Sequence, residues 1–299
     1  MRSSFLAIFV YLNLLFFILF CSIPVITVAS NRVDDHLSTT NKKTVVYKTV
    51  DSVELKMNIY YPDDFCKEKQ YPAIVFFFGG GWYNVNSEQF LPHALVLNKM
   101  GMVAILADYR TMKISGVSPK DCISDARSAM RYIRMHSDKL NIDSKKIAAS
   151  GGSAGGHLAI ATAVIESFDD ESDNKDINPV PDALVLFNPV LDNGPVGGYA
   201  YNKVKEYYKE FSPAHNIKRM MPPTLVMIGT KDKLIPVETI LRFQNNMNEQ
   251  GNICDVYLYS GQGHGFFNYK KEGSNKYYYR TLDDMIAFLK NYNFINDCD

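Results

Sequence analysis

The pattern of apolar and polar positions changes along the chain from alternation to continuous apolar runs. Residues 44–61 (TVVYKTVDSVELKMNIYY) alternate on both sides of a turn at Asp51 and Ser52, which predicts a β-hairpin. Residues 73–80 (AIVFFFGG) and 102–110 (MVAILADYR) are apolar over most of their length, as expected for strands buried on both faces of a sheet. Four later segments also have the character of strands: residues 145–151, 182–190, 224–230 and 254–260.

Helical periodicity occupies several of the segments between these strands. From about Pro119 to His136, apolar residues recur every three or four positions, which predicts a long amphipathic helix. Residues 87–99 and 282–292 predict two further helices. Because strands and helices alternate, the sequence predicts the α/β class, with a mostly parallel central sheet, helices on both faces and an N-terminal β-hairpin.

One long connection interrupts this alternation. Residues 191–219 lie between two predicted strands, and they contain several aromatic side chains together with glycine and proline. A connection of this length is usually either a functional lid or a disordered insertion. The aromatic residues favour a packed segment, so we expect a short cap insertion over the site.

The composition indicates one large domain, which we place at residues 31–299. The chain has 299 residues, of which 46% are hydrophobic and 21% are charged. Lysine and arginine together number 32, as do aspartate and glutamate, and no basic stripe stands out. Binding to nucleic acid would require concentrated positive charge, so we expect no nucleic-acid partner.

The N-terminal 30 residues differ from the rest of the chain. A single charge, Arg2, precedes the apolar run FLAIFVYLNLLFFILF, and small residues end the segment. These features describe a signal peptide, so we expect residues 1–30 to be cleaved and the mature protein to be exported, periplasmic or secreted, without a membrane contact. The alternative is an N-terminal membrane anchor, since residues 5–29 are long enough to span a bilayer. Cys21 would permit a lipid anchor, but a bulky phenylalanine precedes it.

Four cysteines follow this segment: Cys66, Cys122, Cys254 and Cys298. Their spacing contains no CxxC pair, so we expect no metal site, and no motif indicates a cofactor. An exported protein could pair these cysteines as disulfides. Cys122 and Cys254 lie in apolar segments, which favours buried free thiols.

The stretch SGGSAGGH, residues 150–157, contains a motif of chemical interest. Residues 151–155 fit GxSxG and lie where a predicted strand meets a helix. A flexible linker would not be flanked by two buried elements, and a phosphate-binding loop would need the lysine of GxxxxGK[ST]. A sharp strand-to-helix turn that presents a serine needs small neighbours on both sides of it. We therefore predict that Ser153 is a catalytic nucleophile.

A nucleophilic serine needs a histidine base and a carboxylate that orients the histidine. In this context both follow later strands, in the order serine, acid, histidine. Asp232 comes directly after the strand at 224–230, and His264 after the strand at 254–260, so we predict a Ser153-Asp232-His264 triad. Asp192 also follows a strand and is the competing acid. Four other histidines lie on predicted helices or in the cap: His93, His136, His157 and His215.

Acyl transfer also needs hydrogen-bond donors for the developing oxyanion. Three successive glycines, residues 79–81, follow the strand that should neighbour the nucleophile strand. Glycine lets backbone N–H groups approach a substrate oxygen closely. We therefore expect the N–H groups of Gly80, Gly81 and Ala154 to form the oxyanion hole.

Substrate contacts are expected from five aromatic residues: Trp82, Tyr83, Tyr201, Tyr208 and Phe266. The first two end the glycine loop and would narrow the acyl side of a pocket. Rings of the cap could stack on a sugar face while their hydroxyls bind its polar edge, or they could form the cap's own small core. Together with export, these residues favour short acyl esters, acetyl above all, on a small molecule or an oligosaccharide.

Five motifs together resemble a known family: FGGGW (78–82), DYR (108–110), GGSAGGHLA (151–159), GTKDKLIP (229–236) and GQGHGFF (261–267). They are similar to the α/β-hydrolase esterases related to hormone-sensitive lipase, and above all to the branch of exported acetyl-esterase or feruloyl-esterase-like enzymes. The resemblance runs from about residue 45 to the end of the chain. It implies an α/β-hydrolase fold and serine carboxylesterase activity.

Position 78 departs from the family pattern, because phenylalanine stands where many relatives have the histidine of HGGG. Phe78 offers no hydrogen bond to brace the loop, although the oxyanion donors are backbone groups. Two other functions stay open: an exported serine peptidase of the same fold, and a non-catalytic binding protein on a hydrolase scaffold. Such peptidases usually have a gating domain and lack the triple-glycine loop, and such binding proteins typically lose a triad member.

Overall fold

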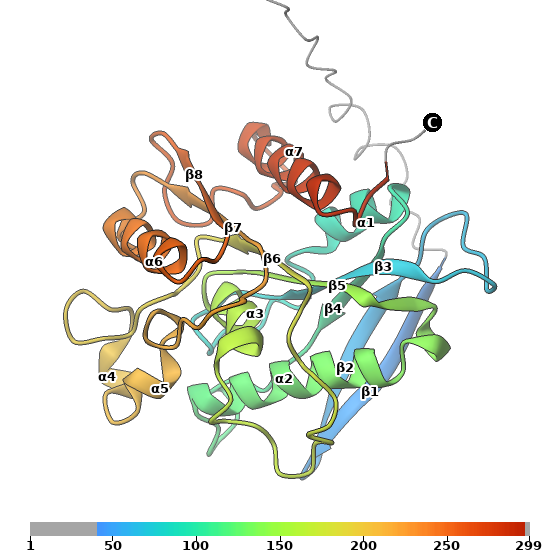
Figure 1. Ribbon diagram of the computed structural model, residues 1–299, viewed down its shortest axis with the longest axis horizontal. Coiled ribbons are helices and arrows are strands. Elements are labelled where there is room, and N and C mark those ends of the chain that lie inside the picture. Colours follow the sequence, from blue (N-terminus) through green and yellow to red (C-terminus); the bar gives the residue numbers. More distant parts are fainter. Residues whose placement is uncertain (1–40, 297–299) are drawn as a thin grey trace, which may run out of the picture.

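The computed structural model describes residues 41–296. They form an eight-stranded sheet with helices on both faces (Figure 1). The strands are β1 (Lys42–Val50), β2 (Val53–Tyr60), β3 (Tyr71–Phe77), β4 (Val103–Ala107), β5 (Ile142–Gly152), β6 (Ala183–Phe187), β7 (Thr224–Gly229) and β8 (Cys254–Tyr259). The helices are α1 (Leu91–Lys99), α2 (Pro119–Met135), α3 (Ala154–Val164), α4 (Tyr201–Val204), α5 (Tyr208–Phe211), α6 (Val237–Glu249) and α7 (Lys276–Asn291), with short 3-10 helices at Asp138–Leu140 and Pro213–His215.

The sheet is mostly parallel, as predicted. Its strand order is β1-β2-β4-β3-β5-β6-β7-β8. The N-terminal hairpin, β1 and β2, joins β4 in antiparallel pairing, and each pair from β4 to β8 across the sheet is parallel. Because the carboxyl ends of parallel strands meet at one edge, the loops after β3, β5, β6, β7 and β8 are brought together there.

The central strands are buried on both faces, which explains their continuous apolar runs. One core lies between the sheet and helices α2, α3 and α6, and the other lies between the sheet and helices α1 and α7 (Figure 1). In β3, Val75 belongs to the first core and Ile74 to the second, because successive side chains of a strand point to opposite faces. The predicted α/β class is confirmed.

Several helix bounds differ from the sequence-based expectation. Helix α1 begins at Leu91 rather than 87, after a series of turns, and its second residue is a proline, which suits a first helical turn. Helix α7 begins at Lys276 rather than 282. Helix α6 was not predicted. Its inner face consists of only a few buried side chains, among them Ile240, Phe243 and Met247, and most of the rest of its surface is polar.

The segment 191–219 contains α4, α5 and the second 3-10 helix. It packs beside α3, where the buried Phe211 stacks on His157 at 4.4 Å between ring centroids. The predicted signal peptide, residues 1–30, lies outside the described residues.

Two further expectations concern cysteines and membrane spans. Of the described cysteines, Cys66, Cys122 and Cys254 are free thiols, and burial raises the pKa of Cys254 to about 12. Cys298 lies outside the described residues. Between residues 41 and 296, no helix has the length and apolarity needed to cross a membrane.

Candidate active site

Ser153 stands at the sharp turn between β5 and α3 in a strained backbone conformation. Its φ of 54° and ψ of −118° are sparsely populated by residues other than glycine. The turn is held by hydrogen bonds, because the Ser153 N–H donates to the carbonyl of Phe187 at 2.9 Å and the Ser153 carbonyl accepts from the N–H of Val190 at 3.2 Å. The end of the neighbouring strand β6 and the residues directly after it therefore fix the position of the serine.

Close backbone packing explains the glycines around the serine. A Cβ at Gly155 would overlap the carbonyl oxygens of Phe77 and Phe78, so the first turn of α3 lies directly against the end of β3. A Cβ at Gly152 would lie 2.6 Å from the ring of Phe267. Small residues on both sides of Ser153 were expected for a strained turn, and this packing gives the physical reason.

His264 and Asp232 form a hydrogen-bonded pair at the carboxyl edge of the sheet. Nδ1 of His264 lies 2.8 Å from Oδ2 of Asp232, whose side chain is fully buried. The other oxygen of Asp232 accepts from the N–H groups of Leu234 and Ile235 at 2.9 and 3.0 Å. A carboxylate can only accept, so Nδ1 carries the proton and Nε2 is left as a proton acceptor.

The charge of Asp232 is stabilised in its buried position. Burial raises the pKa of Asp232, but the hydrogen bonds from His264, Ile235 and Leu234 outweigh burial and hold the pKa below its ordinary value. The carboxylate is therefore ionised at neutral pH, as required of a group that orients a histidine and stabilises an imidazolium.

The competing residues are engaged elsewhere. Asp192 accepts from Arg242 at 3.0 Å and from the N–H of Gly194 at 2.7 Å. His157 is buried and donates from Nε2 to the carbonyl of Phe211 at 2.9 Å. Three further histidines between residues 41 and 296 contact aromatic rings: His93, His136 and His215. The structure thus brings Asp232, and not Asp192, to His264.

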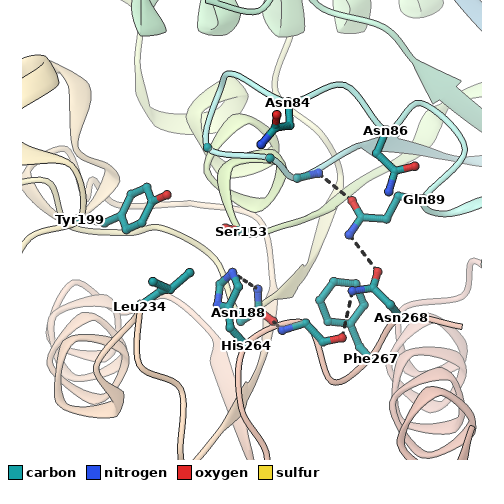
Figure 2. A pocket seen from close by; sticks show the side chains of 14 residues that line it. Asn84, Asn86, Gln89, Ser153, Asn188, Tyr199, Leu234, His264, Phe267 and Asn268 are labelled. Atoms are coloured by element: carbon teal, nitrogen blue, oxygen red, sulfur yellow. Dashed lines mark hydrogen bonds between the residues drawn. The ribbon is translucent and has the colours of Figure 1, made fainter. Parts of the chain in front are cut away.

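Ser153 and His264 line the same cavity, of about 380 Å³ (Figure 2). No lysine, arginine, aspartate or glutamate lines it. The lining consists of Gly79, Gly80, Gly81, Asn84, Asn86, Gln89, Ser153, Asn188, Tyr199, Leu234, His264, Gly265, Phe267 and Asn268. Between residues 41 and 296, no cluster of histidine, cysteine and acidic side chains is arranged to hold a metal ion.

Two of the predicted oxyanion donors, Gly80 and Gly81, lie on the wall of this cavity. Their φ angles of 136° and 64° favour glycine, and within the described residues no hydrogen bond uses either N–H. Ala154 is the first residue of α3, where an N–H has no intrahelical acceptor. The N–H of Gly79, in contrast, donates to Oε1 of Gln89 at 2.6 Å.

The glycine loop is braced although Phe78 offers no side-chain hydrogen bond. The ring of Phe78 stacks on Tyr109 at 4.2 Å between centroids, and the Tyr109 hydroxyl donates to the carbonyl of Phe78 at 2.8 Å. Farther along, the carbonyl of Trp82 accepts from the N–H of Met112 at 2.8 Å. Tyr109 and Gln89 therefore supply the support that the side chain at position 78 does not.

None of the five aromatic residues expected to contact the substrate lines this cavity. Trp82 has an exposed fraction of 0% and packs against His157 and Phe211. Its backbone has a positive φ of 59°, and its side chain lies in the core rather than in the pocket. Tyr83 is instead 48% exposed at the surface.

The other aromatic candidates are also occupied elsewhere. Tyr201 and Tyr208 pack on each other in the cap, with 5.5 Å between their ring centroids. Phe266 packs against Tyr259 at 4.8 Å. Its neighbour Phe267 lines the cavity instead.

Several cavity residues were not predicted. Asn188 is fully buried directly after β6, and a polar residue at the end of an apolar strand was a signal that could have identified it. Gln89 and Asn268 are 179 residues apart and meet in the cavity wall through a hydrogen bond of 2.9 Å. No local pattern in the sequence indicates that contact.

Comparison with known proteins agrees with this geometry. The BD-FAE family model matches residues 57–196, and the model of the prolyl oligopeptidase family matches residues 190–293. The solved structure of esterase 2 from Thermogutta terrifontis with bound propionate is 38% identical, with a TM-score of 0.82, over 88% of this chain and 98% of that one. The chain belongs to the α/β-hydrolase esterases. This esterase is a serine hydrolase that acts on carboxylic esters.

Two curated relatives of the esterase carry names linked to xylan. Endo-1,4-beta-xylanase B of Butyrivibrio fibrisolvens is 30% identical over 62% of this chain, and the acetylxylan esterase of Xylanibacter ruminicola is 25% identical over 73%. The chain spans only 31% of the first relative's length and 45% of the second's.

Proposed function

We propose that the esterase hydrolyses short-chain esters, acetyl esters above all, carried on carbohydrates, through a Ser153-Asp232-His264 triad. The observation that carries this proposal is the placement of Ser153 and His264 on one cavity, with Asp232 hydrogen-bonded behind the histidine. Asp192 is the competing acid, and its ion pair with Arg242 argues against it.

The proposed reaction has two steps. Oγ of Ser153 attacks the ester carbonyl carbon, and Nε2 of His264 takes the serine proton. The carbonyl oxygen becomes an oxyanion, which accepts hydrogen bonds from the N–H groups of Gly80, Gly81 and Ala154. The carbon–oxygen bond to the alcohol then breaks, and His264 gives its proton to the leaving alkoxide, which leaves an acyl-enzyme on Ser153.

Water then removes the acyl group. Nε2 of His264 takes a proton from a water molecule as its oxygen attacks the acyl carbon, and the same donors hold the second oxyanion. The bond to Oγ of Ser153 breaks, the histidine returns the proton to the serine, and the carboxylic acid leaves. Throughout, Asp232 keeps its charge and stabilises the imidazolium formed in each step.

The cavity lining supports an uncharged, hydroxyl-rich substrate. Asn84 and Asn86 present carboxamide groups on one side of Ser153, as Figure 2 shows, beside the hydrogen-bonded pair Gln89 and Asn268. Neither Asn84 nor Asn86 has a side-chain hydrogen-bond partner within the described residues. Carboxamides both donate and accept, which matches the hydroxyls of a sugar. Tyr199, from the segment 191–219, lies across the cavity and supports the proposal that this segment caps the site.

The substrate proposal is tested with matched esters. The values of kcat/KM for p-nitrophenyl acetate, butyrate and octanoate are compared, followed by acetate release from acetylated xylo-oligosaccharide. We expect acetate or butyrate to be preferred, and Asn84→Ala to lower kcat/KM more for the oligosaccharide than for p-nitrophenyl acetate. A tenfold preference for octanoate, about 1.4 kcal/mol in transition-state binding, would contradict the short-acyl proposal. If no acetate is released from the oligosaccharide, the carbohydrate part of the proposal is contradicted.

A second candidate is peptide hydrolysis, because the prolyl oligopeptidase family model matches residues 190–293. The cavity contains no charged side chain to bind a peptide terminus, which favours the ester. With Ala-Pro p-nitroanilide, we expect kcat/KM to be at least a hundredfold below that for p-nitrophenyl acetate. If kcat/KM for the anilide were within tenfold of that for p-nitrophenyl acetate, peptide hydrolysis would be the better-supported function.

Export is also part of the proposal. The apolar run after Arg2, followed by small residues, supports cleavage near position 30, and these residues lie outside the structural description. Intact-mass measurement of protein collected from outside the cytoplasm should show a mature chain that begins near residue 31. Retention of the complete segment in a membrane fraction would instead support an anchor.

A further inference from the structure

The glycine loop is held in an unusual conformation beside the nucleophile. Gly80, Gly81 and Trp82 have successive positive φ angles of 136°, 64° and 59°. Such a segment keeps its shape only where its surroundings over-determine it. To bind an oxyanion, the loop amides must also keep a fixed position relative to Ser153 and His264, since a hydrogen bond weakens steeply with distance and angle.

A glutamine side chain connects this loop to another part of the chain. The N–H of Gly79, directly before the two proposed donors, donates to Oε1 of Gln89 at 2.6 Å. Nε2 of Gln89 donates in turn to Oδ1 of Asn268 at 2.9 Å. Gln89 therefore bonds the backbone of the glycine loop on one side and the loop after β8 on the other (Figure 2).

The hydrogen bonds continue from Asn268 to the histidine. Nδ2 of Asn268 donates to the carbonyl of Gly265 at 2.9 Å, next to His264. The N–H of Gly265 donates to Oδ1 of Asn188 at 3.1 Å. Nδ2 of Asn188 lies 3.4 Å from Nε2 of His264, a long contact at the end of the series.

Each carboxamide in this series accepts on one side and donates on the other. The N–H of Gly79 can only donate, so it fixes which end of the Gln89 amide faces the loop. Because Nε2 of Gln89 then donates to Oδ1 of Asn268, the orientation of the Asn268 carboxamide is also fixed. At the other end, the Gly265 N–H fixes Asn188 in the same way. The series is satisfied in one orientation, and loss of one member leaves partly buried polar groups unpaired.

We propose that Gln89 and Asn268 are positioning residues of the esterase, which hold the oxyanion loop at a fixed place relative to the His264 loop. Neither takes part in bond making. Together with Tyr109, they supply the hydrogen bonds that the side chain of Phe78 cannot make. This inference rests on the proposed function, because it assumes that Gly80 and Gly81 are the oxyanion donors.

The test compares Gln89→Leu, which is similar in size and lacks both hydrogen bonds, with Glu88→Gln on the adjacent exposed position. Removal of one oxyanion donor costs about 10²–10³ in kcat, so loosening a loop that keeps its donors should cost less, about tenfold. For Gln89→Leu we expect this loss in kcat on p-nitrophenyl acetate, with KM within about threefold of the parent value. Glu88→Gln should equal the parent.

A second readout separates positioning from a general loss of folded protein. A short-chain trifluoromethyl ketone adds Oγ of Ser153 to its carbonyl carbon and places an alkoxide in the oxyanion hole. Its inhibition constant should rise in Gln89→Leu by about the factor by which kcat falls, since both depend on the same donors. Partial unfolding would instead lower the concentration of active sites, which titration with paraoxon measures. It would leave the inhibition constant unchanged.

The coupling of the two residues is tested by the double variant. If Gln89 and Asn268 act through one series of hydrogen bonds, Gln89→Leu with Asn268→Leu should lose kcat by no more than about twofold beyond Gln89→Leu alone. Multiplicative losses, or parent values of kcat and of the inhibition constant in Gln89→Leu, would overturn the inference. A parent protein without esterase activity would overturn the proposed function as well, so the two failures are distinct.

Discussion

His93 on α1 has a position that should affect stability in acid. The side chain is fully buried, and within residues 41–296 neither ring nitrogen has a hydrogen-bond partner. Aromatic rings surround it, with those of Phe90, Phe187 and Tyr278 at 5.2, 5.4 and 4.8 Å between centroids. Burial lowers the pKa of His93 to about 3, because the imidazolium would be removed from water without a compensating partner. We predict that His93→Leu makes the protein less sensitive to acid.

The magnitude follows from proton linkage. In an unfolded chain the pKa of histidine is about 6.5. As the pH falls from 7 to 5, the unfolded state takes up a proton that folded His93 does not, so the free energy of unfolding falls. With a folded pKa of about 3, one such histidine lowers the free energy of unfolding by about 2 kcal/mol between pH 7 and pH 5. His157, whose pKa burial also lowers to about 3, should remove a similar amount.

The assay is urea unfolding of the parent and His93→Leu at pH 7 and pH 5. The substitution also changes packing, but this effect on the free energy of unfolding is the same at both pH values. It therefore cancels when the change from pH 7 to pH 5 is compared between the two proteins. The parent should lose about 2 kcal/mol more than His93→Leu on acidification. Phe90→Leu is a neighbouring substitution that removes no titrating group. Its free energy of unfolding should fall between pH 7 and pH 5 by as much as that of the parent. If His93→Leu also lost as much as the parent, His93 would be hydrated or charged in the folded state, which would refute the reasoning.

Two further predictions concern the site. Asp232→Asn should lower kcat for p-nitrophenyl acetate by about 10³–10⁴, because the histidine loses the acceptor that fixes its tautomer, whereas Asp192→Asn should stay within about tenfold of the parent. Steady-state kinetics measures both, and a larger loss in Asp192→Asn would reverse the assignment of the acid. Gly155→Ala should lower the free energy of unfolding by about 3 kcal/mol or more, since its Cβ overlaps the backbone of β3. At Gly116, with open space and a φ of +83°, alanine should cost only about 1 kcal/mol, and equal melting temperatures for the two variants would contradict the packing argument.

Much of the fold follows from local sequence patterns. Continuous apolar strands and amphipathic helices alternate in a regular order, and this order leads to the parallel sheet. The positions of Ser153, Asp232 and His264 follow from the same logic, because each comes directly after a strand and parallel strands end at one edge. The structure places the three at that edge, and their chemical roles stay predictions. Helix α6 was missed because its apolar face is narrow.

The cavity wall was not predictable in the same way. Phe266 and Phe267 are neighbours of one residue type, yet only Phe267 faces the cavity. Trp82 follows the glycine loop directly, but its side chain lies in the core. Residue type does not tell which way a loop side chain points. The contact of Gln89 with Asn268 depends on how distant loops meet, which only the packed fold determines.

We propose that ester hydrolysis proceeds through an acyl-enzyme on Ser153. The most direct measurement is peptide mapping by mass spectrometry of protein inactivated with paraoxon, with residual esterase activity followed in the same sample. We expect one phosphoryl adduct on Oγ of Ser153, formed in proportion to the activity lost. The corresponding peptide of Ser153→Ala, which should be folded and inactive, should carry no adduct. An adduct at another residue that tracks the loss of activity, or full hydrolysis by labelled protein, would contradict it.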